Sequence, residues 1–587
     1  MPWRDHNQIR RCEGDTMHLC LWILIVVINA STLLAATKPD GSRHIRAEIS
    51  FSREASATPI DGRVFLLFST KLSETKKEPR FQIIEDETKS QQIFGVDVDG
   101  LAPEAIIRMD GSVLGYPVRS LDEIPVGDYY VQAVVHRYTT FHRSDGHVVK
   151  LPRDEGEGQE WHSKPGNFYS DVQRIHVDAG GVNIRISVNQ VIPKIEPAKD
   201  TKYIKHIQIQ SKLATDFWGE PMYLGAIVLL PEGWDTHPEA HYPLFVEHTH
   251  FLKDFEVFST EPPAPDLKGD KRTDAEYAYK FYQDWTSGRL PHVLIMVIQH
   301  ANPYYDDSYA VNTANVGPYG DAINSELIPY VEKMFRGIGQ GWARAVYGGS
   351  TGGWESLATQ IFYPSSYNGA WGFCPDPVDF RAYETINIYE DKNAFWREAP
   401  WGKVPQPDSR EPDDLLDSTV EGSVRRELVL GTHGRSGGDW NMWQAVFGPV
   451  GPDGYPKPIW DPSTGVIDHE VAKYWQDHYD LRHILERDWK TLGPQLVGKL
   501  HITVGTRDTF YLEGAVHLLQ KFLESTNNPY YAGDFEYGPH QPHCFTGDAS
   551  LPADLGWLTQ RQRILPKAVE WMLKTAPKSA DTTSWRY

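Results

Sequence analysis

The N-terminal part of the chain is patterned as short β-strands. Residues 40–198 contain runs of β-branched and aromatic residues, most clearly at 63–68, 129–135 and 182–188, with Gly, Pro and Asp clusters between them. Runs of this length and composition, without a competing helical period, predict strands. We therefore expect a β-sandwich-like domain over 40–198.

From about residue 202 the pattern changes to apolar runs that alternate with helix-length stretches. Such alternation predicts a sheet whose strands are joined by crossover helices, and we assign it to an α/β domain over 202–578. The run 293–298 is continuously apolar, as in a strand buried on both faces. The expected strands are 223–230, 243–247, 293–298, 343–347, 370–374, 500–504 and 535–537, and the expected helices are 321–335, 353–362 and 514–525.

The alternation stops between about 380 and 495. This stretch is rich in Trp, Pro, Gly and charged residues. A long insertion inside a regular sheet is usually functional, so we expect a lid or a substrate platform here.

The first 36 residues have the features of a targeting segment. Residues 19–28 are ten consecutive apolar residues, followed by small residues. Such a run is too short to span a bilayer comfortably and is typical of a secretory signal peptide. Acidic residues among the upstream arginines and the absence of a clear cleavage site leave open an uncleaved membrane anchor through 19–36. Either interpretation predicts a secreted, periplasmic or envelope-associated protein.

Composition excludes some classes of protein. Hydrophobic residues make up 40% and aromatic residues 12% of the 587 residues, which argues against a largely disordered chain. The net charge is −21 and Lys and Arg are not clustered, so we expect no nucleic-acid partner. Of the four cysteines, Cys12 and Cys20 lie in or before the targeting segment, so a mature chain would keep only Cys374 and Cys544. Two cysteines cannot define a disulfide scaffold.

The pentapeptide Gly348-Gly349-Ser350-Thr351-Gly352 matches G-x-S-x-G. In this motif a serine nucleophile sits on a strained turn between a strand and a helix, and small neighbours let the helix approach the strand. Gly348, Gly349 and Gly352 would form this nucleophile elbow. An apolar strand pattern precedes Ser350 and a helix pattern follows it, as the geometry requires.

A second match, Gly434-Arg435-Ser436-Gly437-Gly438, lies in the insertion. The strand-like run 428–430 ends well before Ser436, with Gly431-Thr432-His433 between them. We therefore prefer Ser350 as the nucleophile and interpret the second match as a Gly-rich loop.

A serine nucleophile needs a base and an orienting acid. Asp508 follows the expected strand 500–504, where the acid of a Ser–acid–His order belongs; a loop carboxylate or helix cap is the alternative. The loop after the last expected strand contains His540 and His543. We favour His543 as the base and keep His540 as its rival.

The oxyanion hole needs two backbone N–H groups. We expect one from Thr351 and the other from His250 or Phe251, in the loop after the strand 243–247. A His248-x-His250 metal pair is the alternative. Because no further ligands are evident in the sequence, we predict no metal site and no cofactor.

These pieces together resemble the esterase branch of the α/β-hydrolases that includes esterase D-like, feruloyl and enterochelin esterase-like enzymes. The resemblance covers about residues 202–575 without the insertion. It rests on 319–321 with 326–330, on 348–353, on Gly505-x-x-Asp508 and on the final histidine loop. The resemblance implies an eight-stranded, mostly parallel sheet, with motifs specific for the fold and the triad but not for the substrate.

The leading hypothesis is a serine esterase that acts on a small-molecule or polysaccharide-linked ester. A serine peptidase or acyltransferase on the same fold, or an inactive binding protein, are the alternatives. Aromatic residues of the insertion could stack on a sugar or aromatic group of the substrate, or form the core of the insertion itself. Cys374 follows the elbow by one strand and Cys544 adjoins His543, so we also hypothesise a disulfide between them.

Overall fold

The computed structural model describes residues 44–587 except 73–76, 159, 251 and 253. The predicted signal peptide or anchor at 1–36 lies outside the described residues. Within the described part of the chain, no helix combines the length and the apolarity needed to cross a bilayer.

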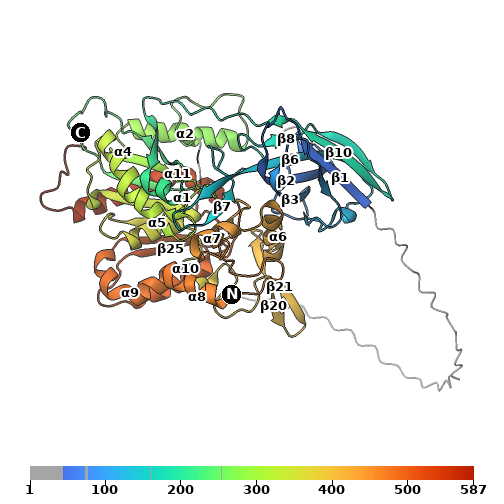
Figure 1. The fold of residues 1–587 in the computed structure, drawn as a ribbon. Coiled ribbons are helices and arrows are strands. Elements are labelled where there is room, and N and C mark those ends of the chain that lie inside the picture. The colour runs from blue at the N-terminus through green and yellow to red at the C-terminus, as the bar shows by residue number, and fades with distance from the viewer. Residues whose placement is uncertain (1–43, 73–76, 159, 251, 253) are drawn as a thin grey trace, which may run out of the picture. The chain divides into compact units, whose positions relative to one another are not determined.

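The N-terminal region is built from two sheets, in agreement with the predicted β-rich region (Figure 1). One sheet has the order β10-β1-β4 and the other β11-β8-β6-β2-β3-β5. The short strands are β4 (Ile107–Met109), β5 (Gly115–Tyr116), β8 (Phe168–Tyr169) and β11 (Gln190–Val191). Side chains alternate between buried and exposed along β1, and a single apolar cluster contains residues of β1, β2, β6 and β10. The two sheets therefore pack face to face around a shared core. The main strands are β1 (His44–Phe51), β2 (Ile60–Ser69), β3 (Gln92–Leu101), β6 (Gly127–His142) and β10 (Gly181–Val188).

The second region contains an eight-stranded sheet of order β12-β13-β15-β14-β18-β19-β24-β25. The strands are β12 (Ile204–Ser211), β13 (Met222–Leu229), β15 (Leu294–Gln299), β14 (Leu244–His248), β18 (Arg344–Gly349), β19 (Ala370–Phe373), β24 (Leu500–Gly505) and β25 (Asp534–Gly538). β12, β13 and β15 pair antiparallel, and from β15 to β25 all pairs are parallel. The predicted α/β-hydrolase fold with a mostly parallel eight-stranded sheet is confirmed.

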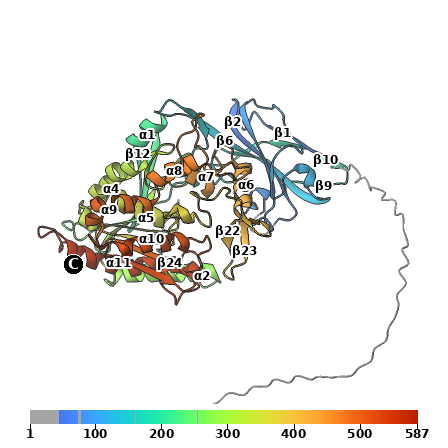
Figure 2. The ribbon, with the colours of Figure 1, turned by 90° about the horizontal axis from the view of Figure 1, so that it is seen from below.

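Helices cover both faces of this sheet. In β19, Gly372 faces α5 (Thr351–Phe362), because an added Cβ would lie 3.0 Å from Leu357. The neighbouring Trp371 lines a surface pocket with Trp571 of α11 (Ala553–Thr575). Successive residues of a strand point to opposite faces, so α5 and α11 lie on opposite sides. α2 (Asp270–Thr286) packs on α11, while α9 (Leu481–Leu496) packs on α5 and on α10 (Glu513–Ser525) (Figures 1 and 2).

The insertion at about 380–495 contains more regular structure than its sequence suggested. Two small hairpins precede four helices. The hairpins are β20–β21 (Trp396–Ala399 and Gly402–Pro405) and β22–β23 (Pro407–Arg410 and Leu416–Thr419). The helices are α6 (Val420–Leu430), α7 (Asp439–Phe447), α8 (His469–His478) and α9. The strand-like interpretation of 428–430 is wrong, since these residues end α6. A run of three apolar residues cannot distinguish the two; capping of α6 by Thr419, whose side chain accepts from the Gly422 N–H at 3.2 Å, favours the helix.

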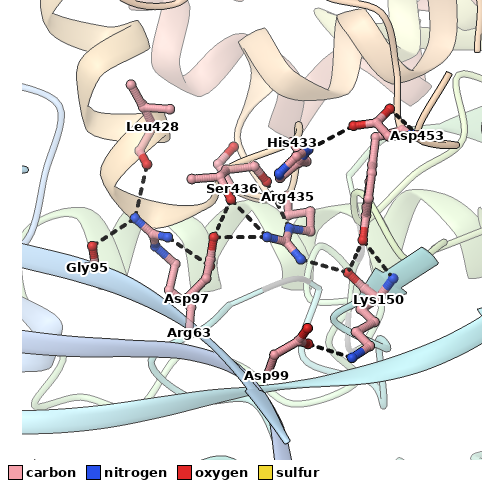
Figure 3. Close-up of polar contacts among 12 residues, drawn as sticks. Arg63, Gly95, Asp97, Asp99, Lys150, Leu428, His433, Arg435, Ser436 and Asp453 are labelled. Carbon is pink, nitrogen blue, oxygen red and sulfur yellow. Dashed lines mark hydrogen bonds and ion pairs between the residues drawn. The ribbon is translucent and has the colours of Figure 1, made fainter. Parts of the chain in front are cut away.

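The insertion also contacts the N-terminal sheets. Val429 and Leu430 of α6 share a small apolar cluster with Phe65 and Leu67 of β2. A polar network surrounds this contact. Arg63 donates to the Val429 carbonyl at 2.7 Å. It also donates to the Leu428 carbonyl at 3.2 Å and pairs with Asp97 at 2.8 Å (Figure 3).

Arg435, next to Ser436, completes this network. Its guanidinium pairs with Asp97 at 3.0 Å and donates to the Lys150 carbonyl at 3.1 Å (Figure 3). The turn between α6 and α7 is thereby tied to the β-rich region through one shared carboxylate.

Candidate active site

Ser350 occupies the sharp turn between β18 and α5. Its backbone has φ 58° and ψ −124°, a strained conformation for a residue with a side chain. Cβ atoms added to Gly348 and Gly352 would lie 2.4 and 2.0 Å from the His248 carbonyl oxygen. Close approach of β14, β18 and α5 thus requires glycine at both positions. Gly349 differs, because the nearest atom to an added Cβ is 3.9 Å away.

His543 lies between Ser350 and Asp508. Its Nε2 is 2.9 Å from Ser350 Oγ, and its Nδ1 is 2.9 Å from Asp508 Oδ2. The three side chains follow β18, β24 and β25, whose carboxyl ends meet at the same edge of the sheet. The structure therefore brings together all three residues that we expected to form a triad.

The environment of Asp508 fixes its orientation. Asp508 is fully buried, and its Oδ1 accepts from the Phe510 N–H at 3.0 Å. The Phe510 ring packs edge-on against His543, with centroids 5.0 Å apart. From the insertion, Arg410 donates to the Asp508 carbonyl at 3.0 Å and to Glu513 at 2.6 Å.

The charge of Asp508 also acts on the base. Burial by itself lowers the pKa of His543, but the Asp508 carboxylate outweighs burial and the pKa is raised well above the usual histidine value. A raised pKa stabilises the imidazolium that forms when neutral His543 takes the serine proton, which is the role of the base in a triad.

The two rival residues lie elsewhere. His540 is exposed, and its backbone N–H donates to Thr506 Oγ1 at 2.8 Å. Ser436 Oγ donates to Glu427 Oε2 at 2.9 Å and accepts from the Gly438 N–H at 3.0 Å. Glu427 in turn accepts from the first amides of α7, at Trp440 and Asn441, so Ser436 belongs to a helix-capping network.

The expected oxyanion donors are placed in part. Thr351 is the first residue of α5, and the first amides of a helix have no intrahelical acceptor. His250 lines two pockets together with Ser350, whereas Phe251 lies outside the described residues. The imidazoles of His248 and His250 diverge: His248 Nδ1 is 3.3 Å from Glu355, and His250 Nδ1 is 3.3 Å from Asp306. The alternative of one metal position shared by His248 and His250 is therefore wrong.

Comparison with known proteins identifies the family. Residues 225–557 match the model of the family described as putative esterase. The chain belongs to this family. The matched range begins in β13, ends in α11 and contains Ser350, Asp508 and His543. The protein is thus a carboxylic-ester hydrolase of the serine type, as the sequence predicted.

Solved structures similar to this esterase are distant. A ferulic acid esterase is 12% identical, with 63% of this chain and 99% of that chain covered and a TM-score of 0.35. An S-formylglutathione hydrolase from Agrobacterium tumefaciens is 12% identical, with 62% of this chain and 98% of that chain covered and a TM-score of 0.31. The fluorophosphonate-binding serine hydrolase F of Staphylococcus aureus is 15% identical, with 63% of this chain and 99% of that chain covered and a TM-score of 0.30. No curated protein matches the chain.

Asp376 is a neighbour of the nucleophile that the sequence did not reveal. Its Oδ1 lies 3.5 Å from Ser350 Oγ, while its Oδ2 accepts from Tyr309 at 2.6 Å and Thr351 Oγ1 at 3.2 Å. Burial raises the pKa of this carboxyl. Asp376 follows β19 just as Asp508 follows β24, so its place after a strand is the signal that could have found it.

The pocket next to Ser350 in this esterase is acidic and aromatic. The insertion and the N-terminal region both contribute to it. Its acidic residues are Glu85, Asp376, Glu384, Asp408, Glu427 and Asp439, its basic residues are Arg426 and His250, and its aromatic residues are Trp440, Trp443 and Phe510.

The two cysteines of the described region are free, which contradicts the disulfide hypothesis. The sulfur atoms of Cys374 and Cys544 and one His543 nitrogen lie within 4.8 Å of one another. The thiols are neighbours without an S–S bond, which would be about 2.05 Å long.

Proposed function

We propose that the enzyme hydrolyses its ester through an acyl-enzyme formed on Ser350, with His543 as the base and Asp508 as the orienting acid. The observation that supports this most directly is the position of His543, whose two ring nitrogens each lie 2.9 Å from one of the other two side chains. The strained backbone of Ser350, which points the hydroxyl out of the turn, supports it independently.

The reaction follows from this geometry. Ser350 Oγ attacks the carbonyl carbon while His543 Nε2 takes the hydroxyl proton. The ester C–O bond then breaks, and His543 gives the proton to the leaving alcohol. A water molecule repeats the sequence on the acyl-enzyme and releases the acid. The amide of Thr351, with one from His250 or Phe251, would hold the oxyanion.

We further propose that the substrate is extracellular and that the protein is secreted, periplasmic or held at the cell envelope through 19–36. This rests on the apolar run 19–28 and the small residues after it. N-terminal sequencing of the protein recovered from membrane and soluble fractions tests it; a cytosolic chain with its N-terminus intact would contradict it.

A fluorophosphonate probe tests the catalytic assignment, because it labels a serine only when a neighbouring base activates it. We expect labelling of the full chain, its loss in Ser350→Ala, and normal labelling in the matched control Ser436→Ala. A folded wild-type chain that takes no label would overturn the proposal and favour a binding protein. Labelling that survives Ser350→Ala but not Ser436→Ala would place the nucleophile in the insertion.

A further inference from the structure

The pocket beside Ser350 contains six carboxyl groups but only two basic residues, Arg426 and His250. The mechanism uses none of these six. In a partly dehydrated site, an excess of one charge sign selects ligands of the opposite sign. The excess of carboxyl groups over basic groups should therefore affect which substrate binds and not how the ester bond is broken.

Most of the six carboxyls are satisfied by the protein itself. Asp408 accepts from Ser418 and Ser423 at 2.7 Å and from Trp440 Nε1 at 3.1 Å. Glu427 caps α7, as described above, and Glu85 pairs with Arg426. Asp376 accepts from Tyr309, Thr351 and Trp443, and Asp439 accepts from Tyr305.

Glu384 is different. It is 4% exposed and lines the pocket, yet its Oε2 has no hydrogen-bond partner in the described part of the chain. Burial, reinforced by the neighbouring Asp408 and Asp376, raises the pKa of this carboxyl well above its usual range. A buried acceptor without a donor is costly unless a ligand supplies one.

The carboxyl groups of the pocket are not arranged for a metal ion. In the described residues, possible metal ligands converge within 4.8 Å in three groups, which contain Cys374, His248 and His250 respectively. None of these groups contains Glu384, Asp408, Asp439 or Glu427. What the pocket offers is a carboxyl with one unpartnered oxygen, that of Glu384, and the indoles of Trp440 and Trp443 among its other lining residues. A carboxylate together with aromatic rings is the combination that recognises an organic ammonium group.

Resting on the proposed ester hydrolysis, we infer that the substrate is a cationic ester whose ammonium group binds in this pocket, against Glu384 and the faces of Trp440 and Trp443. The bound ammonium supplies the positive charge that the surroundings of Glu384 lack, and this charge lets Glu384 ionise. Glu85 belongs to the N-terminal region, between η1 (Pro79–Phe81) and β3, so that region contributes to substrate selection.

Isosteric ester pairs test the inference with the full chain. In the first pair, the acetate ester of choline is compared with the neutral ester in which carbon replaces the quaternary nitrogen. In the second pair, the acetate ester of an alkyl alcohol that carries a primary ammonium group is compared with the ester in which methyl replaces this ammonium. A second set carries the same groups on the acyl side. We expect kcat/KM to be about tenfold or more higher for the cationic member of at least one pair.

Glu384→Gln, which keeps the shape and removes the charge, should abolish most of this preference, measured as the ratio of kcat/KM for the cationic and neutral members of one pair. Glu390→Gln, at an exposed neighbour of the same segment, is the matched control and should keep the full preference. The wild-type comparison stands even if Glu384→Gln fails to fold.

The outcomes separate the two proposals. Equal or lower kcat/KM for the cationic members of all pairs overturns the cationic substrate while leaving ester hydrolysis intact. A preference for esters of glycerol or glucose over both members of every pair would also overturn it. The carboxyl groups of the pocket would then bind hydroxyl groups of the substrate. An unlabelled, folded enzyme that hydrolyses none of the esters overturns the proposed function instead.

Discussion

The chain contains the G-x-S-x-G pattern twice, and the two copies lie in different structural surroundings. Around Ser350 the chain leaves a buried strand and enters a helix, with a positive φ at the serine and His543 at 2.9 Å. Around Ser436 the chain joins two helices, and the hydroxyl is held by Glu427 at 2.9 Å. One serine faces a base in a pocket, and the other stabilises a helix start. The elements around the motif, not the motif, decide which serine can react.

The largest effect should come from the nucleophile. Ser350→Ala should lower kcat for any ester that the enzyme hydrolyses by about 10⁶-fold, as for other triad serines. Ser436→Ala, measured in the same steady-state assay, should stay within about tenfold of wild type because it changes no group in contact with the reacting atoms. Equal losses in both variants would erase the difference between the two turns.

The two histidines sharpen the comparison next. His543→Ala should cost almost as much as Ser350→Ala, since members of a triad act as a unit. His540→Ala should leave kcat within about threefold, because His540 is exposed and contacts Thr506 through its backbone. A collapse of turnover in His540→Ala, with His543→Ala still active, would reverse the assignment of the base.

Asp508→Asn should lower kcat by about 10⁴-fold and change the pH profile. The base must be neutral to accept a proton, so activity falls as pH drops through its pKa. Because the pKa of His543 is raised, the wild type should lose activity at a higher pH than an ordinary histidine enzyme would. Removing the Asp508 charge should move this acidic limb of kcat/KM to lower pH; a limb that stays in place would show that another group controls it.

The smallest effects concern stability, and they should reverse the order of the two serines. Ser436→Ala leaves Glu427 without one hydrogen bond in a buried site and should lower the free energy of unfolding by about 1–3 kcal/mol. Ser350→Gly removes a side chain from a positive-φ position and should raise it by about 1 kcal/mol. Urea denaturation of both variants checks this pair, and a stabilising Ser436→Ala would contradict the capping role.

What the sequence predicted well depends on local pattern. The apolar runs at 293–298 and 343–347 became β15 and β18 because buried parallel strands leave a continuous signal. Asp508 was found because it follows such a strand, β24, and His543 because it lies in the loop after the last expected strand. Residues 428–430 were misassigned because three apolar residues carry no period.

The pocket could not be predicted in the same way. Glu85, Asp376 and Glu384 are far apart in the chain and meet only through packing of the insertion and the N-terminal sheets on the catalytic region. These residues became candidates because the pocket contains more carboxyl groups than basic groups and because one oxygen of Glu384 has no hydrogen-bond donor in the described residues. Both properties depend on the folded surroundings. The expected disulfide failed for a related reason, because proximity of Cys374 and Cys544 does not by itself form an S–S bond.

The shared carboxylate of Asp97, which holds both Arg63 and Arg435, limits how this enzyme can be shortened or redesigned. A protein engineer who removed the β-rich region to obtain a minimal hydrolase would also release the α6–α7 turn and delete Glu85 from the pocket. Swapping that region between related enzymes would, in contrast, exchange Glu85 together with the Asp97 partner of the α6–α7 turn. The N-terminal sheets thus support the pocket from outside the part of the chain that carries the residues proposed for the reaction.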